Sequence, residues 1–163
     1  MRVRTATRSD VPAMLELERE IPTSANWSRQ HFESLFRTNT SELSRYFVLV
    51  VEDPSESRRA AESALTSAIV AYLAAHSVDS DWELQYVVVT KRFRRRGVGA
   101  YLLNEFISHV RATGGRQIFL EVRESNQSAR RLYNALGFKE TGLRKSYYAN
   151  PPEDAILYQL SLY

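Results

Sequence analysis

The segment from Trp82 to Glu121 constrains the fold of this chain more than any other. An apolar run, WELQYVVVT, is followed by the basic sequence KRFRRRGVGA, then by a stretch with helical periodicity, and then by a second apolar run, QIFLEV. A turn that leads from a strand into a helix presents unpaired backbone N–H groups, and the positive end of the helix dipole favours an anion there. The segment therefore predicts a site for a phosphate-containing ligand.

The helix expected after this turn runs from residue 98 to 112. Its apolar residues recur at three- and four-residue spacing and so share one face; they are Val98, Leu102, Leu103, Phe106, Ile107 and Val110. Glycines at 114 and 115 are expected to end it. The run at 82–90 predicts a strand whose alternate residues lie on one face; these are Trp82, Leu84, Tyr86 and Val88.

The other elements follow from periodicity and from cap and turn residues. Further strands are expected at 2–6, 46–52, 67–75, 117–122, 138–143 and 155–162, with helices beginning near Thr7 and Ser28 and over 126–136. Longer loops are expected at 53–65 and over the tyrosine-rich residues 144–154. This order predicts a single α/β (α+β) domain over residues 1–163, with a mixed sheet and helices on both of its faces.

Composition excludes several kinds of protein. The chain contains no cysteine, so disulfides, thiolate metal sites and a cysteine nucleophile are absent. The three histidines, His31, His76 and His109, lack metal-ligand spacing, and we expect no metal. No apolar run reaches the roughly 18 residues of a membrane span, and the N-terminus does not resemble a signal peptide. We therefore expect a cytoplasmic protein with no membrane partner.

Five basic residues lie between Lys91 and Arg96. Such a run is often a solvated surface turn, and it could also mark a nucleic-acid-binding module. No aromatic platform surrounds it in the sequence, which disfavours direct nucleic-acid binding. Its position directly before Gly97 favours binding of a small anion instead.

The glycine pattern separates three kinds of phosphate site. A dinucleotide site of the Rossmann type would have a small residue where this chain has Leu102, and a P-loop would continue Gly-Lys-Ser/Thr where this chain has Gly99-Ala100-Tyr101. Both are disfavoured. The pattern Arg94-x-x-Gly97-x-Gly99 resembles the coenzyme A pyrophosphate loop of the Gcn5-related N-acetyltransferase (GNAT) superfamily.

Within that superfamily, the chain looks like the bacterial enzymes that acetylate the N-terminal alanine of a small-subunit ribosomal protein. The segments IFLEVRESNQSARRLYNALGFKETGLRKSYY and EDAILYQL, with NWS at 26–28, carry this likeness. It is close from residue 82 to 160 and looser in the N-terminal third, and the loop at 53–65 is a departure. The resemblance implies a mostly antiparallel sheet of about seven strands, splayed between the fourth and the fifth. It also implies acetyl-CoA as cosubstrate and the N-terminus of an acceptor protein, a ribosomal one, as partner.

The resemblance also assigns coenzyme contacts to particular residues. In such enzymes the strand before the loop has a bulge, and its free backbone groups pair with the pantetheine arm; here these are Val87, Val88 and Val89. The diphosphate would lie on the loop and the first helical turn, at Arg94, Arg95, Arg96, Gly97, Val98, Gly99 and Ala100. Asn126 matches a position that bonds the coenzyme's arm, although by sequence alone it is a helix N-cap, and the two roles can coexist.

Two residues match the family's acid and base. Alternation in IFLEV places Glu121 on the face opposite Ile118 and Leu120, and the resemblance implies that Glu121 is the general base. The alternative is a solvent-exposed carboxylate or one paired with an arginine such as Arg123. Tyr133 matches the general acid, and its alternative is a core tyrosine on the apolar stripe of its helix.

Selection of the acceptor is expected to depend on loop residues. The resemblance places Trp27, Tyr147 and Tyr148 around the acceptor peptide, whereas Tyr147 and Tyr148 could equally be strand-end residues that pack on the sheet. The base has a modest task with an α-amino group, whose pKa is about 7.7–8.0. A small amine or a lysine side chain, with a pKa of about 10.4 for lysine, is the alternative acceptor.

Overall fold

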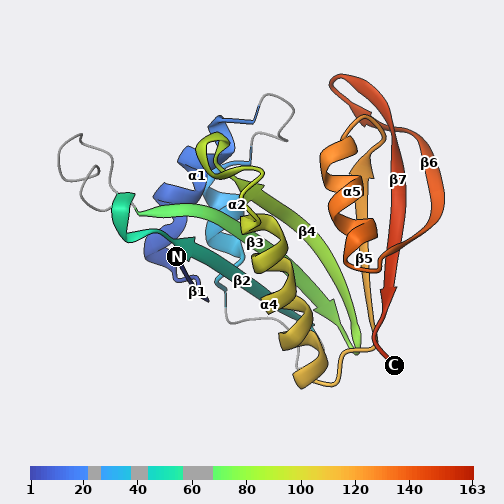
Figure 1. The fold of residues 1–163 in the computed structure, drawn as a ribbon, viewed down its shortest axis with the longest axis horizontal. Coiled ribbons are helices and arrows are strands. Elements are labelled where there is room, and N and C mark those ends of the chain that lie inside the picture. The colour runs from blue at the N-terminus through green and yellow to red at the C-terminus, as the bar shows by residue number, and fades with distance from the viewer. Residues whose placement is uncertain (22–26, 38–43, 57–67) are drawn as a thin grey trace.

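The computed structural model describes residues 1–21, 27–37, 44–56 and 68–163 (Figure 1). The order of helices and strands is the one expected from the sequence. In chain order the elements are β1 Arg2–Thr5, α1 Val11–Arg19, α2 Arg29–Ser34, β2 Ser44–Glu52, β3 Ile69–Val78, β4 Asp81–Val89, α4 Val98–Ala112, β5 Gln117–Arg123, α5 Gln127–Ala135, β6 Lys139–Ala149 and β7 Pro152–Ser161. Residues 57–65 of the expected loop lie outside the described part of the chain.

The strands form one seven-stranded sheet in the order β1-β2-β3-β4-β5-β7-β6. All neighbouring pairs are antiparallel except β4 and β5, which are parallel. Helices α1 and α2 cover one face of the sheet, and α4 and α5 cover the other (Figure 1). The predicted mixed, mostly antiparallel sheet with helices on both faces is confirmed.

The sheet has a separate hydrophobic core on each face. Buried residues of α4, together with Tyr133 of α5, pack on β4, β5 and β7 in the larger core. Buried residues of α1 and α2 pack on β2 and β3 in the other. The side-chain period of two in the strands therefore decides which core each strand residue joins.

An extra residue in β4 breaks that period. Leu84 lies opposite Ala75 of β3, whereas Tyr86 lies opposite the adjacent Ala74, so Gln85 has no counterpart. This is a β-bulge, in which two residues of one strand face one residue of its partner. The bulge falls where β4 leaves β5.

The bulge corrects the predicted faces of β4. Alternation predicted that Trp82, Leu84, Tyr86 and Val88 share one face. Trp82 and Leu84 do join the α4 core, but Val88 belongs to the α1 and α2 core, and Tyr86 packs against it. A one-residue insertion moves every later side chain to the opposite face, and alternation alone does not reveal it.

A second correction concerns the tyrosine-rich segment, which was expected to be a loop. Strand β6 continues to Ala149 and β7 begins at Pro152, so only a short turn separates them. Tyrosine favours a pleated, half-buried surface, and β7 pairs with β6 both before and after residues 145–147. The tyrosines are therefore held on a strand.

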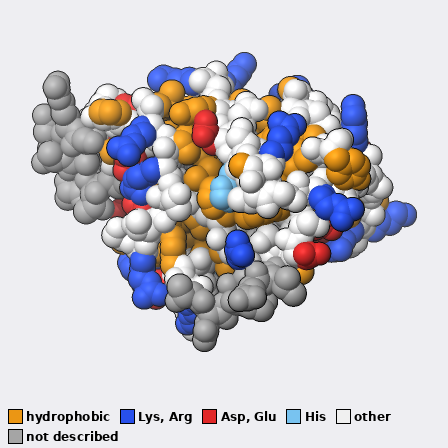
Figure 2. Space-filling view, turned by 90° about the horizontal axis from the view of Figure 1, so that it is seen from below, with side chains coloured by type: hydrophobic (Ala, Val, Ile, Leu, Met, Phe, Trp, Pro, Cys, Tyr) orange, Lys and Arg blue, Asp and Glu red, His pale blue; other side chains and the backbone are white. Residues whose placement is uncertain are grey.

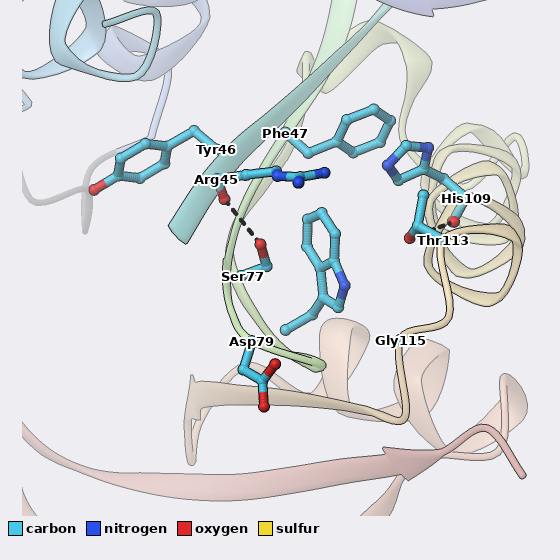
Figure 3. A pocket seen from close by; sticks show the side chains of 9 residues that line it. Arg45, Tyr46, Phe47, Ser77, Asp79, His109, Thr113 and Gly115 are labelled. Carbon is cyan, nitrogen blue, oxygen red and sulfur yellow. Dashed lines mark hydrogen bonds between the residues drawn. The ribbon is translucent and has the colours of Figure 1, made fainter. Parts of the chain in front are cut away.

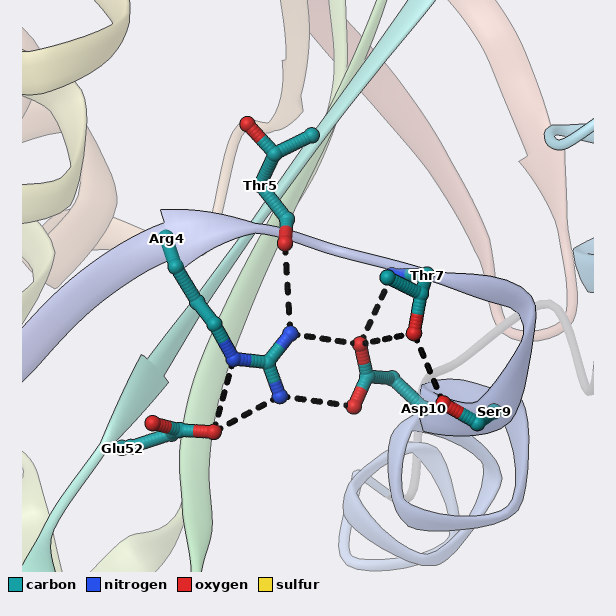
Figure 4. Close-up of polar contacts among 6 residues, drawn as sticks. All are labelled: Arg4, Thr5, Thr7, Ser9, Asp10 and Glu52. Carbon is teal, nitrogen blue, oxygen red and sulfur yellow. Dashed lines mark hydrogen bonds and ion pairs between the residues drawn. The ribbon is translucent and has the colours of Figure 1, made fainter.

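Arg4 joins β1 to the start of α1 and the end of β2 (Figure 4). Its guanidinium donates to both carboxylate oxygens of Asp10, at 2.7 and 2.8 Å, and to Glu52 at 2.7 Å. The Asp10 carboxylate also accepts the backbone N–H of Thr7, which caps the helical turn as the sequence predicted. The hydrogen bonds from Arg4 hold the pKa of Asp10 below its usual value.

We predict that Asp10→Asn lowers the free energy of unfolding at pH 7 by about 1–3 kcal/mol, because it removes a charge-assisted pair from a nearly buried site. A lowered folded-state pKa stabilises the fold above the unfolded pKa of about 3.9, and this contribution is lost as the pH falls through the folded pKa. The deficit should therefore be smaller in acid. Urea unfolding at pH 7 and pH 3 measures it, with the exposed Glu16→Gln as control; an equal deficit at both pH values would contradict the assignment.

Candidate active site

Strands β4 and β5 separate partway along their length. They pair only from Asp81 with Gln117 to Leu84 with Leu120, although β4 continues to Val89 and β5 to Arg123. The expected splay between the fourth and fifth strands is thereby confirmed. Beyond the bulge, Val87–Val89 pair with β3 on one side, and within the described residues no strand pairs with their other edge.

The chain turns sharply from β4 into α4. Arg95 and Gly97 both have left-handed backbone conformations, with φ of 60° and 79°. The first intrahelical bond joins the N–H of Tyr101 to the carbonyl of Gly97 at 2.9 Å. The N–H groups of residues 98–100 precede it and have no partner within the helix, so they form an anion-binding end.

Two side chains secure this turn. The Glu20 carboxylate accepts from the Thr90 hydroxyl at 2.9 Å and from the backbone N–H of Lys91 at 3.1 Å. Arg94 Nε donates to the Val89 carbonyl at 2.9 Å. Arg94 is therefore bonded to its own strand end, whereas Arg95 and Arg96 are exposed at the helix N-terminus.

Helix α5 packs directly against the first turn of α4. A Cβ added at Gly99 would lie 3.2 Å from a methyl carbon of Leu132, so glycine allows the two helices to pack this closely without displacing the leucine. Asn126 is the N-cap of α5, and its side chain accepts the N–H of Ala129 at 3.2 Å. The N-cap interpretation of Asn126 is confirmed. Its expected contact with the coenzyme stays a prediction.

Glu121 lies on the open face of β5, on the side opposite the α4 core. Its Oε1 atom is 3.0 Å from Nη1 of Arg144 on β6, and its side chain is 23% exposed. The sequence allowed for an arginine partner of Glu121. The structure shows such a partner, but it is Arg144 and not Arg123. Arg123 instead donates to Glu153 and stacks on Tyr148, with its guanidinium carbon 4.1 Å from the ring centroid.

Tyr133 lies on the other face of β5 from Glu121 and is 8% exposed. It packs against Phe138 and Tyr158, as a core tyrosine does. Burial and then the neighbouring Tyr148 raise its pKa. Tyr133 is therefore held as a protonated phenol at neutral pH.

Tyr148 lies half-buried beneath the Arg123 guanidinium. Burial and then the charge of Glu121 raise the pKa of Tyr148 to about 12, so Tyr148 is a neutral phenol at neutral pH. No direct contact between Glu121 and Tyr133 is seen.

Aromatic side chains form the opposite wall of the opening. Trp27 packs on His31 with ring centroids 3.7 Å apart and the rings tilted by 32°, and it meets Tyr86 edge-on at 4.9 Å. Tyr147, which is 48% exposed, meets Tyr148 edge-on at 5.1 Å. Trp27 and Tyr86 thus form one aromatic group, and Tyr147 and Tyr148 form another.

Among the described residues, two polar atoms in this region lack a hydrogen-bond partner. They are Nε2 of His31 and Oε1 of Gln85, the bulge residue, and both are buried. Burial also lowers the pKa of His31. Buried polar atoms are nearly always paired, so an unpaired one calls for a partner such as a bound ligand.

A cavity of about 460 Å³ lies elsewhere, at the end of α4 farthest from the basic turn (Figure 3). Phe47 and His109 stack at 3.7 Å on one wall, and Trp82 forms another. Figure 2 looks onto this end of the molecule and shows apolar side chains around a histidine, with lysines and arginines spread round them. The cavity shares no lining residue with the opening between β4 and β5.

Sequence reasoning missed Tyr86 and Arg144. Tyr86 was assigned to the wrong face because of the bulge, and Arg144 was placed in a loop that is in fact a strand. Within the described residues, no group of three or more histidine and carboxylate side chains is placed to hold a metal ion. Among the same residues, no helix has the length and apolarity of a membrane span.

The geometry agrees with comparisons to known proteins. Residues 11–138 match the acetyltransferase (GNAT) family, and the chain belongs to this family. A [ribosomal protein bS18]-alanine N-acetyltransferase of Salmonella typhimurium is 41% identical over 78 residues, 47% of this chain and 53% of that protein. The chain thus spans about half the length of this curated relative.

Solved structures share the whole fold. The crystal structure of the ribosomal-protein-S18-alanine N-acetyltransferase from Escherichia coli is 26% identical, with a TM-score of 0.77 over 98% of this chain and 92% of that one. Arabidopsis thaliana NAA60, solved with a bisubstrate analogue, has a TM-score of 0.81 at 16% identity over 98% and 97% of the two chains, a likeness of fold alone.

We predict that Gly97→Ala lowers the free energy of unfolding by about 1–2 kcal/mol, because a Cβ in a left-handed conformation is strained. Nothing lies within 4 Å of that Cβ, so the cost would be conformational and not steric. Gly97→Asn should cost less, since asparagine tolerates this conformation. Denaturant unfolding of both variants tests the turn; equal losses would contradict the conformational explanation.

Proposed function

We propose that this protein transfers an acetyl group from acetyl-CoA to the N-terminal α-amino group of a protein, the N-terminal alanine of a small-subunit ribosomal protein. The observation that carries the proposal is the opening between β4 and β5, which has the anion-binding end of α4 near one strand and the Glu121 carboxylate on the other. The names of the Salmonella and E. coli relatives support the choice of acceptor.

The chain offers a fitting site for the coenzyme. Free N–H groups of Val98, Gly99 and Ala100, with the exposed Arg95 and Arg96, suit a diphosphate. The unpaired edge of Val87–Val89 suits an extended, amide-containing arm, and Asn126 at the start of α5 is the proposed side-chain contact to that arm. Acetyl-CoA would supply an activated thioester to this site.

Glu121 is the proposed proton acceptor. An ammonium acceptor must lose a proton before its nitrogen can attack the thioester carbon, and its pKa of about 7.7–8.0 makes this loss easy. The C–S bond then breaks as the C–N bond forms. In total the nitrogen gives up two protons. In the net balance the thiolate gains one proton and the other leaves to solvent.

Tyr133 is the proposed proton donor to the thiolate. Its raised pKa keeps the phenol protonated, which the donor must be at rest. After that donation Tyr133 regains a proton from one of the two that the nitrogen gives up, and the other leaves to solvent.

The aromatic wall is the proposed acceptor site. Trp27, Tyr86, Tyr147 and Tyr148 give contact area at low entropic cost. The unpaired atoms of His31 and Gln85 suit the backbone amides of an entering peptide.

We expect Glu121→Gln and Tyr133→Phe each to lower kcat by about 10²-fold or more, because general acid and base groups contribute on this scale. Acetyl-CoA should still bind both variants, since neither residue lies in the diphosphate turn. Steady-state kinetics with calorimetric titration of acetyl-CoA separates the two effects. Unchanged turnover in both variants would remove these roles.

A panel of short peptides that differ only in their first residue tests the acceptor. We expect an alanine-start ribosomal peptide to be acetylated fastest, with free small amines and an N-terminally blocked lysine peptide as controls. Faster transfer to lysine, with a rate that keeps rising toward pH 10, would instead indicate the side-chain amine as the acceptor, given its pKa of about 10.4.

A further inference from the structure

We infer that Arg144 is a positioning residue, which holds the Glu121 carboxylate in place for the acetyl transfer. This inference rests on the proposed function. Arg144 Nη1 is 3.0 Å from Glu121 Oε1, and the Arg144 side chain is 55% exposed. Its guanidinium carbon also lies 5.3 Å from the centre of the Tyr147 ring.

An irregularity of β6 brings these groups to the carboxylate. Arg144 pairs with Ala155 and Tyr148 with Glu153, so four steps along β6 span two steps along β7. The two extra residues arch out of the ladder, and the arch is secured where the N–H of Ser146 donates to Asp154 at 2.6 Å. The arch is therefore a built feature of the hairpin.

Tyr147, on this arch, lies beside the ion pair. Its ring faces the Arg144 guanidinium, and the neighbouring Glu121 carboxylate raises the pKa of Tyr147. A carboxylate has about four lone-pair positions, so the contact from Arg144 still leaves positions for an entering ammonium. The carboxylate is thus oriented without being blocked.

Stability and rate should respond differently to loss of this pair. An ion pair this exposed contributes little to folding stability. In contrast, a displacement of about 1 Å in a reacting group can cost about 10²-fold in rate. Arg144 is accordingly expected to matter for turnover and not for the fold.

The test compares Arg144→Gln and Arg144→Lys with Arg111→Gln, an exposed control at the end of α4. We expect Arg144→Gln to lower kcat about tenfold, with the acceptor KM, the acetyl-CoA affinity and the unfolding midpoint changed by little. Arg144→Lys keeps the single charged contact and should restore most of the loss. A wild-type kcat for Arg144→Gln, or a loss that appears only in KM, would overturn the inference.

A double-mutant cycle distinguishes action through Glu121 from an independent effect. In the Glu121→Gln background, which has no carboxylate for Arg144 to position, adding Arg144→Gln should cost less than about twofold. If kcat of the double variant falls by the product of the two single-variant factors, the inference is overturned, and the assignment of Glu121 as the base stays intact. Wild-type turnover by Glu121→Gln alone would instead reject the base of the proposed function.

Discussion

The parallel pairing of β4 with β5 lasts for four residue pairs and then stops, and the rest of the site depends on this interruption. A central strand normally has both edges bonded, because unpaired backbone groups in a protein interior are costly. Here the bulge at Gln85 turns the end of β4 away from β5. The freed edge, the turn after it and the N-terminus of α4 then line one opening together.

Contacts from distant parts of the chain keep the opening in shape. Glu20, at the end of α1, bonds Thr90 and Lys91 where β4 ends. On the other side, Arg123 donates to the carbonyls of Asn150 and Pro151 in the turn between β6 and β7. Each wall is thus tied to a different helix or hairpin, and the two cores pack independently on opposite faces of the sheet.

The fold was largely predictable because its signals are local. The helix at Val98–Ala112 was predicted with its observed bounds, since its apolar stripe is regular and glycines flank it. The inward and outward faces of β5 were also correct, with Ile118 buried and Glu121 on the opposite face. The predicted faces of β4 were wrong after Gln85. The residues that follow Gln85 are apolar and suit either core, so the sequence pattern does not reveal the inserted residue.

The candidate site was predictable only in part, for the same reason. Gly97 and Asn126 were found because each has a local conformational role, a left-handed turn and a helix cap. Arg144 and Tyr86 were not found, because their roles arise from strand register and from an arch in β6, and neither leaves a local pattern.

The sequence by itself determined the element order, the basic turn before α4 and the residue types that could carry acid and base chemistry. These depend on interactions within a few residues along the chain. Only the tertiary structure decided which arginine meets Glu121, which face Tyr86 occupies and that Tyr133 is buried in the core on the other face of β5. Such choices depend on the register between strands. A register shift of one residue moves each side chain of a strand to the opposite face of the sheet without any change in amino-acid composition.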